Sequence, residues 1–321
     1  MKASSPGQIF LFGEHAVVYG QPALLASIGL RTIVEAEVSD NSSFTVKSEK
    51  VGEMKSTVDK TNGEWKIKNS SGDVDALRYV VKVAELVFNY CDFGTGVSLS
   101  ISSDLPLGAG LGSSSAVTTA TAAAISTALG KDLDKDEIAD LSYKAETEIQ
   151  GAASRAGVSV ATYGGFLRIQ DRGLKSLKKL SNLEILIGYS GEYGDTGKMV
   201  NKVRNLRESS PSIYDPIIKT IGKATEAGIE ALKRKNLKKT CVLMNANQSL
   251  LEGLRVSSPK LQKLIESSRD SGASGIKITG SGGGGCIIVV GIEDFESTAD
   301  AIKESGGIPI RTEIGLEGLK Y

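Results

Sequence analysis

Apolar and polar side chains alternate over residues 32–38 and 97–101, which is the pattern of half-buried β-strands. Between these segments, residues 39–75 are polar and are broken by Asn-Ser-Ser, Asn-Gly and Ser-Gly-Asp. Such breaks favour hairpins and exposed loops. The first third of the chain is therefore predicted to be rich in β-structure.

Two helices are predicted in the middle of the chain. Residues 116–129 are rich in alanine and threonine, span about four helical turns and end at Gly130, which suits the position after a helix. A second helix is predicted over residues 135–150, because Asp134 followed by Glu137 has the pattern of a capping box.

The apolar residues of the second helix share one face, so its two late glutamates do not both need to face a core. Residues 159–169 are predicted to form a strand, and the charged segment 170–182 carries no strand pattern. We therefore place a domain boundary in that segment. The predicted domains are residues 1–172 and 173–321.

The second half alternates between strands and helices. Pro259 after Ser258 fits the first helical position after an N-cap, and a glycine cluster separates two short apolar strands. The predicted strands are 184–188, 276–279, 286–291 and 308–312, and the predicted helices are 215–233, 237–251, 259–271 and 295–304. This order predicts an α+β fold with two sandwich-like halves.

The 321 residues include 38 basic and 38 acidic side chains, so the net charge is about zero. This balance argues against nucleic acid or an acidic membrane surface as the main partner. Three cysteines, far apart, predict neither a disulfide framework nor a zinc site. The N-terminus lacks an apolar leader, and no run of about 18 apolar residues could cross a membrane. We expect a cytoplasmic protein.

The strongest chemical signal is a glycine- and serine-rich stretch between a predicted strand and a predicted helix, residues 106–115. Its backbone N–H groups would line a helix N-terminus, where the dipole attracts anions, and its hydroxyls could bind phosphate or Mg²⁺. It is not a Walker loop, because it lacks Gly-Lys-Ser/Thr. The candidate phosphate-binding residues are Pro106, Gly108, Gly110, Leu111, Gly112, Ser113, Ser114 and Ser115.

The stretch PLGAGLGSSSA resembles the ATP-binding motif of the GHMP kinases, which include galactokinase, homoserine kinase, mevalonate kinase and phosphomevalonate kinase. SPGQIFLFGEHAVVYG at residues 5–20 resembles the first family motif, and GEHAVVYG is the mevalonate kinase version. KITGSGGGGC at residues 277–286 resembles the third motif, and residues 151–165 also resemble the family. The resemblance covers essentially the whole chain.

The resemblance implies an N-terminal domain related to ribosomal protein S5 domain 2 and a ferredoxin-like C-terminal domain, with ATP and a small acceptor in the cleft. It implies that Ser114 and Glu146 hold Mg²⁺, and that Glu14 and His15, the only histidine, line the acceptor pocket. Glu148 is expected to be a solvated helix residue. The third motif adds three further substrate candidates, Thr279, Gly280 and Ser281.

The chain departs from that family at two positions. The family usually has a lysine directly after the Pro-Gly of the first motif, and here that residue is Gln8. It also has an aspartate eleven residues after the magnesium-binding glutamate, and here that residue is Gly157. In the family the lysine–aspartate pair orients the attacking hydroxyl and is the candidate general base.

Three interpretations follow from this double loss. Phosphoryl transfer to mevalonate could proceed without the pair, because a loose transition state depends mostly on positioning and charge neutralisation. The acceptor could instead be already phosphorylated, with mevalonate 3-phosphate, free at its 5-hydroxyl, the best fit. Loss of a carboxylate at Gly157 would remove a repulsive charge, and Arg155 nearby could hold a phosphate. The third interpretation is a non-catalytic nucleotide- or metabolite-binding regulator.

Other charged residues could serve the cleft. Lys198 follows Gly-Asp-Thr-Gly in a loop that, by resemblance, lies over the phosphates, and it is a catalytic candidate. Asp195 is a candidate substitute base, although Asp-Thr-Gly also suits a simple turn. Cys286 is expected in the core. Homodimers are common in the family, but no segment identifies an interface. Further cationic candidates are Arg204, Arg207 and Lys277.

Overall fold

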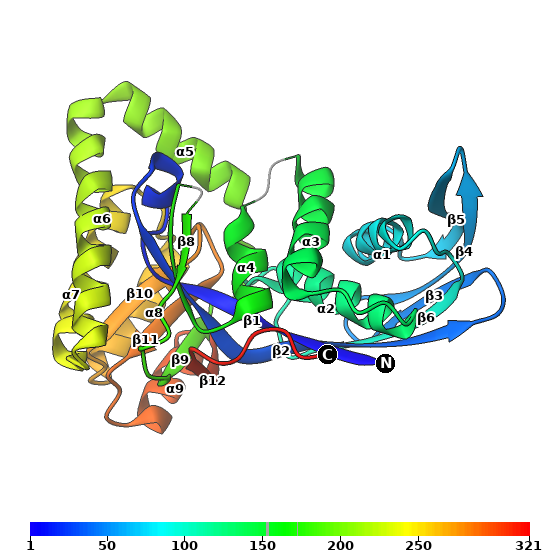
Figure 1. Cartoon of the computed structure of the whole chain (residues 1–321). Coiled ribbons are helices and arrows are strands. Elements are labelled where there is room, and N and C mark those ends of the chain that lie inside the picture. Colours follow the sequence, from blue (N-terminus) through cyan, green and yellow to red (C-terminus); the bar gives the residue numbers. More distant parts are fainter. Residues whose placement is uncertain (152–153, 172) are drawn as a thin grey trace.

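The computed structural model describes residues 1–151, 154–171 and 173–321, which form one large mixed sheet flanked by helices (Figure 1). The strands are β1 (Lys2–Phe12), β2 (Ala23–Ser39), β3 (Ser43–Ser48), β4 (Gly52–Thr61), β5 (Glu64–Gly72), β6 (Gly96–Ser103), β7 (Phe166–Gln170), β8 (Gly173–Ser176), β9 (Leu183–Tyr189), β10 (Gly275–Thr279), β11 (Cys286–Val290) and β12 (Ile308–Ile314). The helices are the 3₁₀ helix η1 (Ala16–Tyr19), α1 (Arg78–Tyr90), α2 (Ser113–Ala128), α3 (Lys135–Gln150), α4 (Arg155–Tyr163), α5 (Thr196–Ser209), α6 (Pro211–Lys233), α7 (Leu237–Gly253), α8 (Pro259–Asp270) and α9 (Phe295–Glu304).

Strand β2 connects the two halves of the molecule. The strand order is β10-β11-β9-β12-β2-β6-β3-β4-β5, with β1 also paired to β2 and β7 paired to β2 and β8. Among the described strands, only the β3–β6 pairing is parallel. The 17-residue β2 pairs with β1 from Leu24 to Glu35, with β7 near its start and with β6 over its second half, and it meets β12 where Ile28 faces Ile314.

Helix side chains cover both outer edges of this sheet. In α1, Asn89 and Glu85 accept hydrogen bonds from backbone N–H groups of β5 at 2.8 and 3.0 Å. In α7, Asn245 and Gln248 accept hydrogen bonds from N–H groups of β10, both at 2.9 Å. Exposed edges invite pairing with other chains, so these contacts protect both ends of the sheet.

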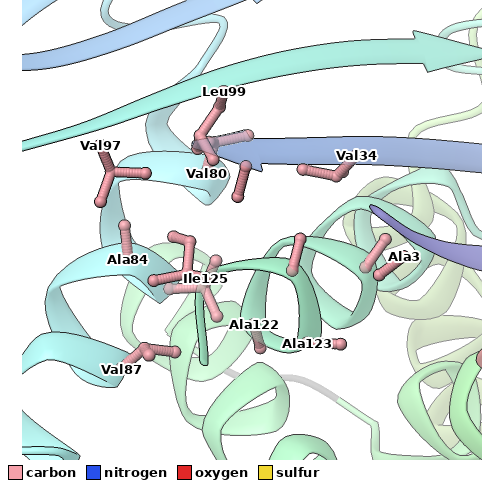
Figure 2. Close-up of a cluster of buried hydrophobic side chains, with 14 of the residues drawn as sticks. Ala3, Val34, Val80, Ala84, Val87, Val97, Leu99, Ala122, Ala123 and Ile125 are labelled. Carbon is pink, nitrogen blue, oxygen red and sulfur yellow. The ribbon is translucent and has the colours of Figure 1, made fainter. Parts of the chain in front are cut away.

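The N-terminal core lies between the sheet and helices α1 and α2. Figure 2 shows Ala122, Ala123 and Ile125 of α2 in one apolar cluster with Val80 of α1 and strand residues such as Val97. The small alanine side chains let α2 approach its neighbours closely, which explains why an alanine-rich helix is almost entirely buried. The first serines of α2 are thereby fixed relative to α3.

The last residues of the chain return to the N-terminal half (Figure 1). Lys320 bridges to Ser4 in β1, and the Leu319 N–H donates to the Thr162 carbonyl at 3.0 Å. Strand β8 pairs with β7 across the predicted boundary between residues 172 and 173, and residue 172 itself lies outside the described residues. The predicted domain limits therefore stay a prediction.

Most predicted elements are present, and several end signals are confirmed. Asp134 and Glu137 form the capping box of α3, and Gly130 has a φ of 71° just after α2. The Ser258 side chain accepts a hydrogen bond at the start of α8, with Pro259 next. The predicted hairpins within 39–75 are β3, β4 and β5.

The predicted strand over 159–169 is confirmed for residues 166–169, which lie in β7, and is wrong for residues 159–163. This segment is the end of α4, a turn, and then β7. The Ser154 side chain caps α4 by accepting from the Ala156 N–H at 3.2 Å. The β-branched residues of the segment suggested a strand, but α4 is buried from residue 156 to residue 162, so burial outweighs local strand preference. Within the described ranges, no helix has the length and apolar character needed to cross a bilayer.

Helix α1, strand β1 and helix α5 were not predicted. The signal for α1 was available, because Val80, Val83, Ala84 and Val87 follow the helical spacing and are all buried. Helix α5 gives a weaker signal, since Met199 and Val203 alone are buried.

Candidate active site

The glycine-rich loop before α2, residues 105–112, is the candidate phosphate loop. It is held in place by buried apolar side chains that alternate with glycines. Leu105, Ala109 and Leu111 are buried in the core, and the Gln8 N–H in β1 donates to the Leu111 carbonyl at 2.8 Å. The intervening glycines 108, 110 and 112 all have φ values between 68° and 75°. Only glycine adopts this conformation readily, so the loop holds its backbone in a turn that side chains would strain.

The loop ends at the N-terminus of α2, which no described side chain caps. Its first N–H groups are thus available to an anion, as expected for a phosphate site. A cavity of about 190 Å³ opens beside this helix start and is lined by Ser113 and Ser114 together with apolar side chains such as Val80 of α1, Ile101 of β6 and Val117 of α2. The combination suits a ligand with an apolar ring and a charged tail.

Glu146 in α3 faces the start of α2. Its side chain is 4% exposed, and the Ser115 hydroxyl donates to Glu146 Oε1 at 2.8 Å. Burial raises the pKa of the Glu146 carboxyl, and hydrogen bonds from Ser115 and Ser114 oppose that rise. By contrast, Glu148 is 40% exposed in its side chain and pairs with Lys82 at 3.2 Å. The structure thus brings Ser114 and Glu146 together and places Glu148 on the surface.

These oxygens suit Mg²⁺. The buried Glu146 carboxylate has no cationic partner among the described residues, and hydroxyl and carboxylate oxygens are the ligands that Mg²⁺ prefers. No cluster of three or more metal-binding side chains is present in the described ranges. Mg²⁺ commonly uses one or two carboxylates together with phosphate oxygens and water, so a single carboxylate is enough.

Gln8 and Gly157 lie side by side, although they are far apart in the sequence. A Cβ on Gly157 would lie 3.0 Å from Gln8 Nε2 and only 2.4 Å from Ser115 Oγ. Gln8 also packs against Gly112 at the end of the phosphate loop. The Gln8 Oε1 atom is buried and has no hydrogen-bond partner among the described residues. The two departures from the family pattern therefore form one neutral patch beside the start of α2.

The third motif packs against the phosphate loop. A Cβ on Gly285 would lie 3.1 Å from the Ala109 carbonyl oxygen, and one on Gly280 would lie 3.6 Å from that of Gly110. Thr279 is buried, and its hydroxyl accepts from the Phe10 N–H at 2.8 Å and is 3.1 Å from the Phe10 carbonyl. The Thr279 side chain is thus used to join β10 to β1.

His15 contacts the third motif directly. Its Nε2 lies 2.9 Å from the Ser281 carbonyl oxygen, and the Ser281 hydroxyl is 3.2 Å from that of Thr196 at the start of α5. Burial lowers the pKa of His15. His15 has a φ of 59°, which is uncommon for a residue other than glycine. These contacts join three segments around one wall of the candidate acceptor site.

Glu14 is buried, and its carboxylate is already occupied by protein contacts. Glu14 Oε1 pairs with Lys277 Nζ, and Glu14 Oε2 accepts from Asn247 Nδ2 at 3.4 Å. The structure brings Glu14 next to His15, but its side chain faces β10 and α7.

The remaining candidates lie at the surface. Arg155 is 66% exposed in its side chain, pairs with Asp140 at 2.8 Å and lies over the Tyr143 ring. It starts α4, and two residues on, Gly157 points to the opposite, buried side. The structure therefore does not bring Arg155 to the neutral patch, and residues 152–153 before it lie outside the described residues.

Helix α5 carries the other cations. Asp195 caps it by accepting from the Lys198 N–H at 2.9 Å, so its carboxylate is used as a helix cap. The Lys198 side chain is exposed, as is that of Arg204, and neither forms an ion pair among the described residues. Arg207 pairs with Asp215.

Cys286 is buried in β11 as expected, and burial raises the pKa of its thiol. Sequence reasoning missed Tyr193, whose ring is 72% exposed and would lie 2.6 Å from a Cβ on Gly108. It packs on the phosphate loop, and a lone aromatic residue in a polar loop gives no sequence signal for that contact.

Two family models match the chain, the GHMP kinases N terminal domain over residues 78–165 and the GHMP kinases C terminal over residues 229–306. The fold and the phosphate loop thus define an ATP-dependent phosphotransferase with the two-domain, α+β GHMP kinase fold.

Individual relatives indicate which branch of the GHMP kinases this chain resembles most. The chain is 40% identical over 324 residues to the mevalonate kinase of Thermococcus sibiricus, covering 99% of this chain and 97% of that protein. It is 39% identical over 325 residues to the mevalonate kinase of Pyrococcus furiosus, with the same coverage. The crystal structure of the Methanococcus jannaschii mevalonate kinase matches with a TM-score of 0.82 at 31% identity, covering 97% of each chain. The chain belongs to the mevalonate kinase family.

Proposed function

We propose that this protein phosphorylates the 5-hydroxyl of mevalonate 3-phosphate in isoprenoid biosynthesis, giving mevalonate 3,5-bisphosphate. The observation that carries the proposal is the neutral patch of Gln8, Gly157 and Ser115 beside the phosphate loop. The family pattern expects a lysine–aspartate pair at positions 8 and 157, and here neither charge is present.

The phosphate loop would bind the ATP phosphates through the free N–H groups at the start of α2, and the adjacent cavity would receive the base. When bound by Ser114 and Glu146, Mg²⁺ would supply positive charge that neutralises the transferring phosphoryl group. The reaction forms a bond between the acceptor 5-oxygen and the γ-phosphorus, breaks the bond from that phosphorus to the ADP oxygen, and releases the hydroxyl proton.

The residues of the neutral patch would orient the acceptor without ionising. The buried Gln8 Oε1 has no partner and can accept a hydrogen bond from the acceptor hydroxyl after a small side-chain rotation. A loose phosphoryl-transfer transition state needs little early deprotonation, so an oriented hydroxyl and neutralised charge are sufficient.

A phosphorylated acceptor fits this patch better than it fits a charged pair. An aspartate at position 157 would repel a phosphate group at short range, and glycine removes that charge. Lys198 and Arg204 on α5 are exposed without an ion-pair partner among the described residues, and Thr196 of the same helix contacts Ser281. In the proposed complex, these two cations are the candidates for holding the phosphate of the acceptor. The proposal does not depend on Arg155.

Plain mevalonate is the second candidate acceptor, because relatives about 40% identical over nearly the whole chain carry the name mevalonate kinase. A non-catalytic regulator is disfavoured, since binding a nucleotide or metabolite alone gives no reason for the buried Glu146 carboxylate, which is costly without a bound metal.

The proposal is tested by coupled ADP release with Mg-ATP and mevalonate, mevalonate 3-phosphate or mevalonate 5-phosphate, with the product located by ³¹P NMR. We expect turnover with the 3-phosphate and two phosphomonoester signals in the product. Turnover with mevalonate alone would favour the second candidate. No turnover together with tight Mg-ATP binding would favour the regulator. Glu146→Gln is the control for contaminating kinase activity.

A further inference from the structure

Three polar side chains form a buried cluster between the loop after β1, strand β10 and helix α7. Lys277 is 0% exposed, Glu14 2% and Asn247 0%. Lys277 Nζ contacts Glu14 Oε1 and donates to the Ile278 carbonyl at 2.5 Å. Asn247 Nδ2 donates to Glu14 Oε2, and Asn247 Oδ1 has no hydrogen-bond partner among the described residues. The cluster therefore joins the first and third sequence motifs inside the protein.

Stability alone does not explain this ion pair. Taking two charges out of water costs several kcal/mol each, and apolar residues of similar size are often as stable or more stable. The opposing effects are visible at both groups, because burial raises the pKa of Glu14 and lowers that of Lys277, while each partner's charge counteracts the shift.

The ion pair fixes the loop that carries His15. Gly13 has a φ of 94°, and a Cβ there would lie 2.4 Å from Ala23 Cα. The backbone of the loop therefore packs closely against the start of β2. Lys277 holds Glu14 through the buried ion pair. The next residue, His15, has a φ of 59°, and its Nε2 lies 2.9 Å from the Ser281 carbonyl oxygen. A residue in this conformation persists where its surroundings enforce it.

We propose that Lys277 is a positioning residue for the acceptor site: by holding Glu14, it keeps His15 on Ser281 and thereby sets the wall of the site next to α5. Glu14 acts in the same way and does not itself touch the acceptor. This inference rests on the proposed function, since it concerns the site of that acceptor.

The test compares wild type, Lys277→Met, Glu14→Gln and the double variant. Each single variant leaves an unpaired buried polar or charged group, so its unfolding midpoint should fall by about 6 °C or more, whereas the double should return to within about 2 °C of wild type. In the double, the acceptor KM should stay raised at least about tenfold. The KM for ATP should change less than about twofold, since neither substituted side chain contacts the phosphate loop.

Amide hydrogen exchange gives a readout that does not need turnover. Residues 13–19 and 280–283 should exchange faster in the stable double variant than in wild type. The matched control replaces the exposed pair Arg311 and Glu184, 2.6 Å apart on β12 and β9, by Met and Gln. It should change neither the acceptor KM nor the amide exchange of the two segments.

A double variant with wild-type acceptor KM and wild-type exchange in both segments would overturn the proposal, because the pair would then be purely structural. If wild type itself turns over no acceptor, the proposed function fails. Exchange in the two segments then still decides whether Lys277 positions His15 and Ser281.

Discussion

Gly157→Ala is the most informative single substitution, because its consequences can be worked out from the contacts. The added Cβ would lie 2.4 Å from Ser115 Oγ, a distance that real side chains do not tolerate. The Ser115 hydroxyl must then move and lose its 2.8 Å hydrogen bond to Glu146.

The magnitude follows from three effects. Losing a hydrogen bond to a charged group costs about 1.5–3 kcal/mol, and overpacking costs about 1–3 kcal/mol. Replacing glycine by alanine inside helix α4 stabilises the helix by about 1 kcal/mol, which offsets part of this loss. We therefore expect a net loss of about 1.5–5 kcal/mol in the free energy of unfolding.

The Ser115→Ala background removes the collision with residue 115 and leaves Gln8 Nε2, 3.0 Å from the added Cβ at the end of a flexible side chain, as its nearest neighbour. The nearest atom of residue 115 is then its Cβ, 3.4 Å from the new methyl group, which is ordinary van der Waals contact. In that background Gly157→Ala should change stability by less than about 1 kcal/mol, so the two substitutions should couple by about 2 kcal/mol. An aspartate at position 157 would also place its Cβ 2.4 Å from Ser115 Oγ, so it does not fit while residue 115 is a serine in its present position.

The assay is urea unfolding of wild type, both single variants and the double, followed by circular dichroism, with unchanged m-values as the check that the comparison is valid. A coupling free energy below about 0.5 kcal/mol would refute the reasoning, because Ser115 would then not fill the space beside Gly157.

Three further predictions concern the candidate site. Glu146→Gln should lower kcat at least about 10³-fold in the ADP-release assay, because it removes the buried carboxylate proposed for the metal, and near-normal turnover would exclude that role. Arg155→Ala should change the KM for mevalonate and mevalonate 3-phosphate by less than about twofold, since an exposed pair with Asp140 contributes little; a selective rise for the 3-phosphate would return Arg155 to substrate recognition. Burial lowers the pKa of His15, so the unfolded state binds the proton more readily and stability from this residue is lost as pH falls below about 6.5. Unfolding at pH 7.5 and 5.5 should show a smaller acid-induced loss in His15→Asn than in wild type, and equal losses would contradict the buried neutral imidazole.

Local signals in the sequence predicted much of the fold. The capping box at Asp134 and Glu137, the glycine after α2 and the proline at the start of α8 each satisfy backbone groups within a few residues, so they can be recognised without tertiary structure. Helix α4 could not be recognised in this way. Its β-branched residues favour a strand, and only burial in the folded protein makes it a helix.

The candidate site shows the same limit. The glycine-rich loop before α2 and Glu146 could be chosen as candidates from motifs, because the chemistry proposed for them depends on residue type and spacing. The orientation of Arg155 depends on the helix that carries it, and the pairing of Glu14 with Lys277 depends on a contact between residues 263 positions apart. Neither contact leaves a pattern along the chain.

The central claim is that the neutral patch at Gln8 and Gly157 selects an acceptor that already carries a phosphate. Its most direct test is the ratio of kcat/KM for mevalonate 3-phosphate to kcat/KM for mevalonate, measured on wild-type protein at the same Mg-ATP concentration. We predict a ratio above about 10², which corresponds to about 2.7 kcal/mol of selective transition-state binding. A ratio near or below one would contradict the claim and identify mevalonate as the acceptor.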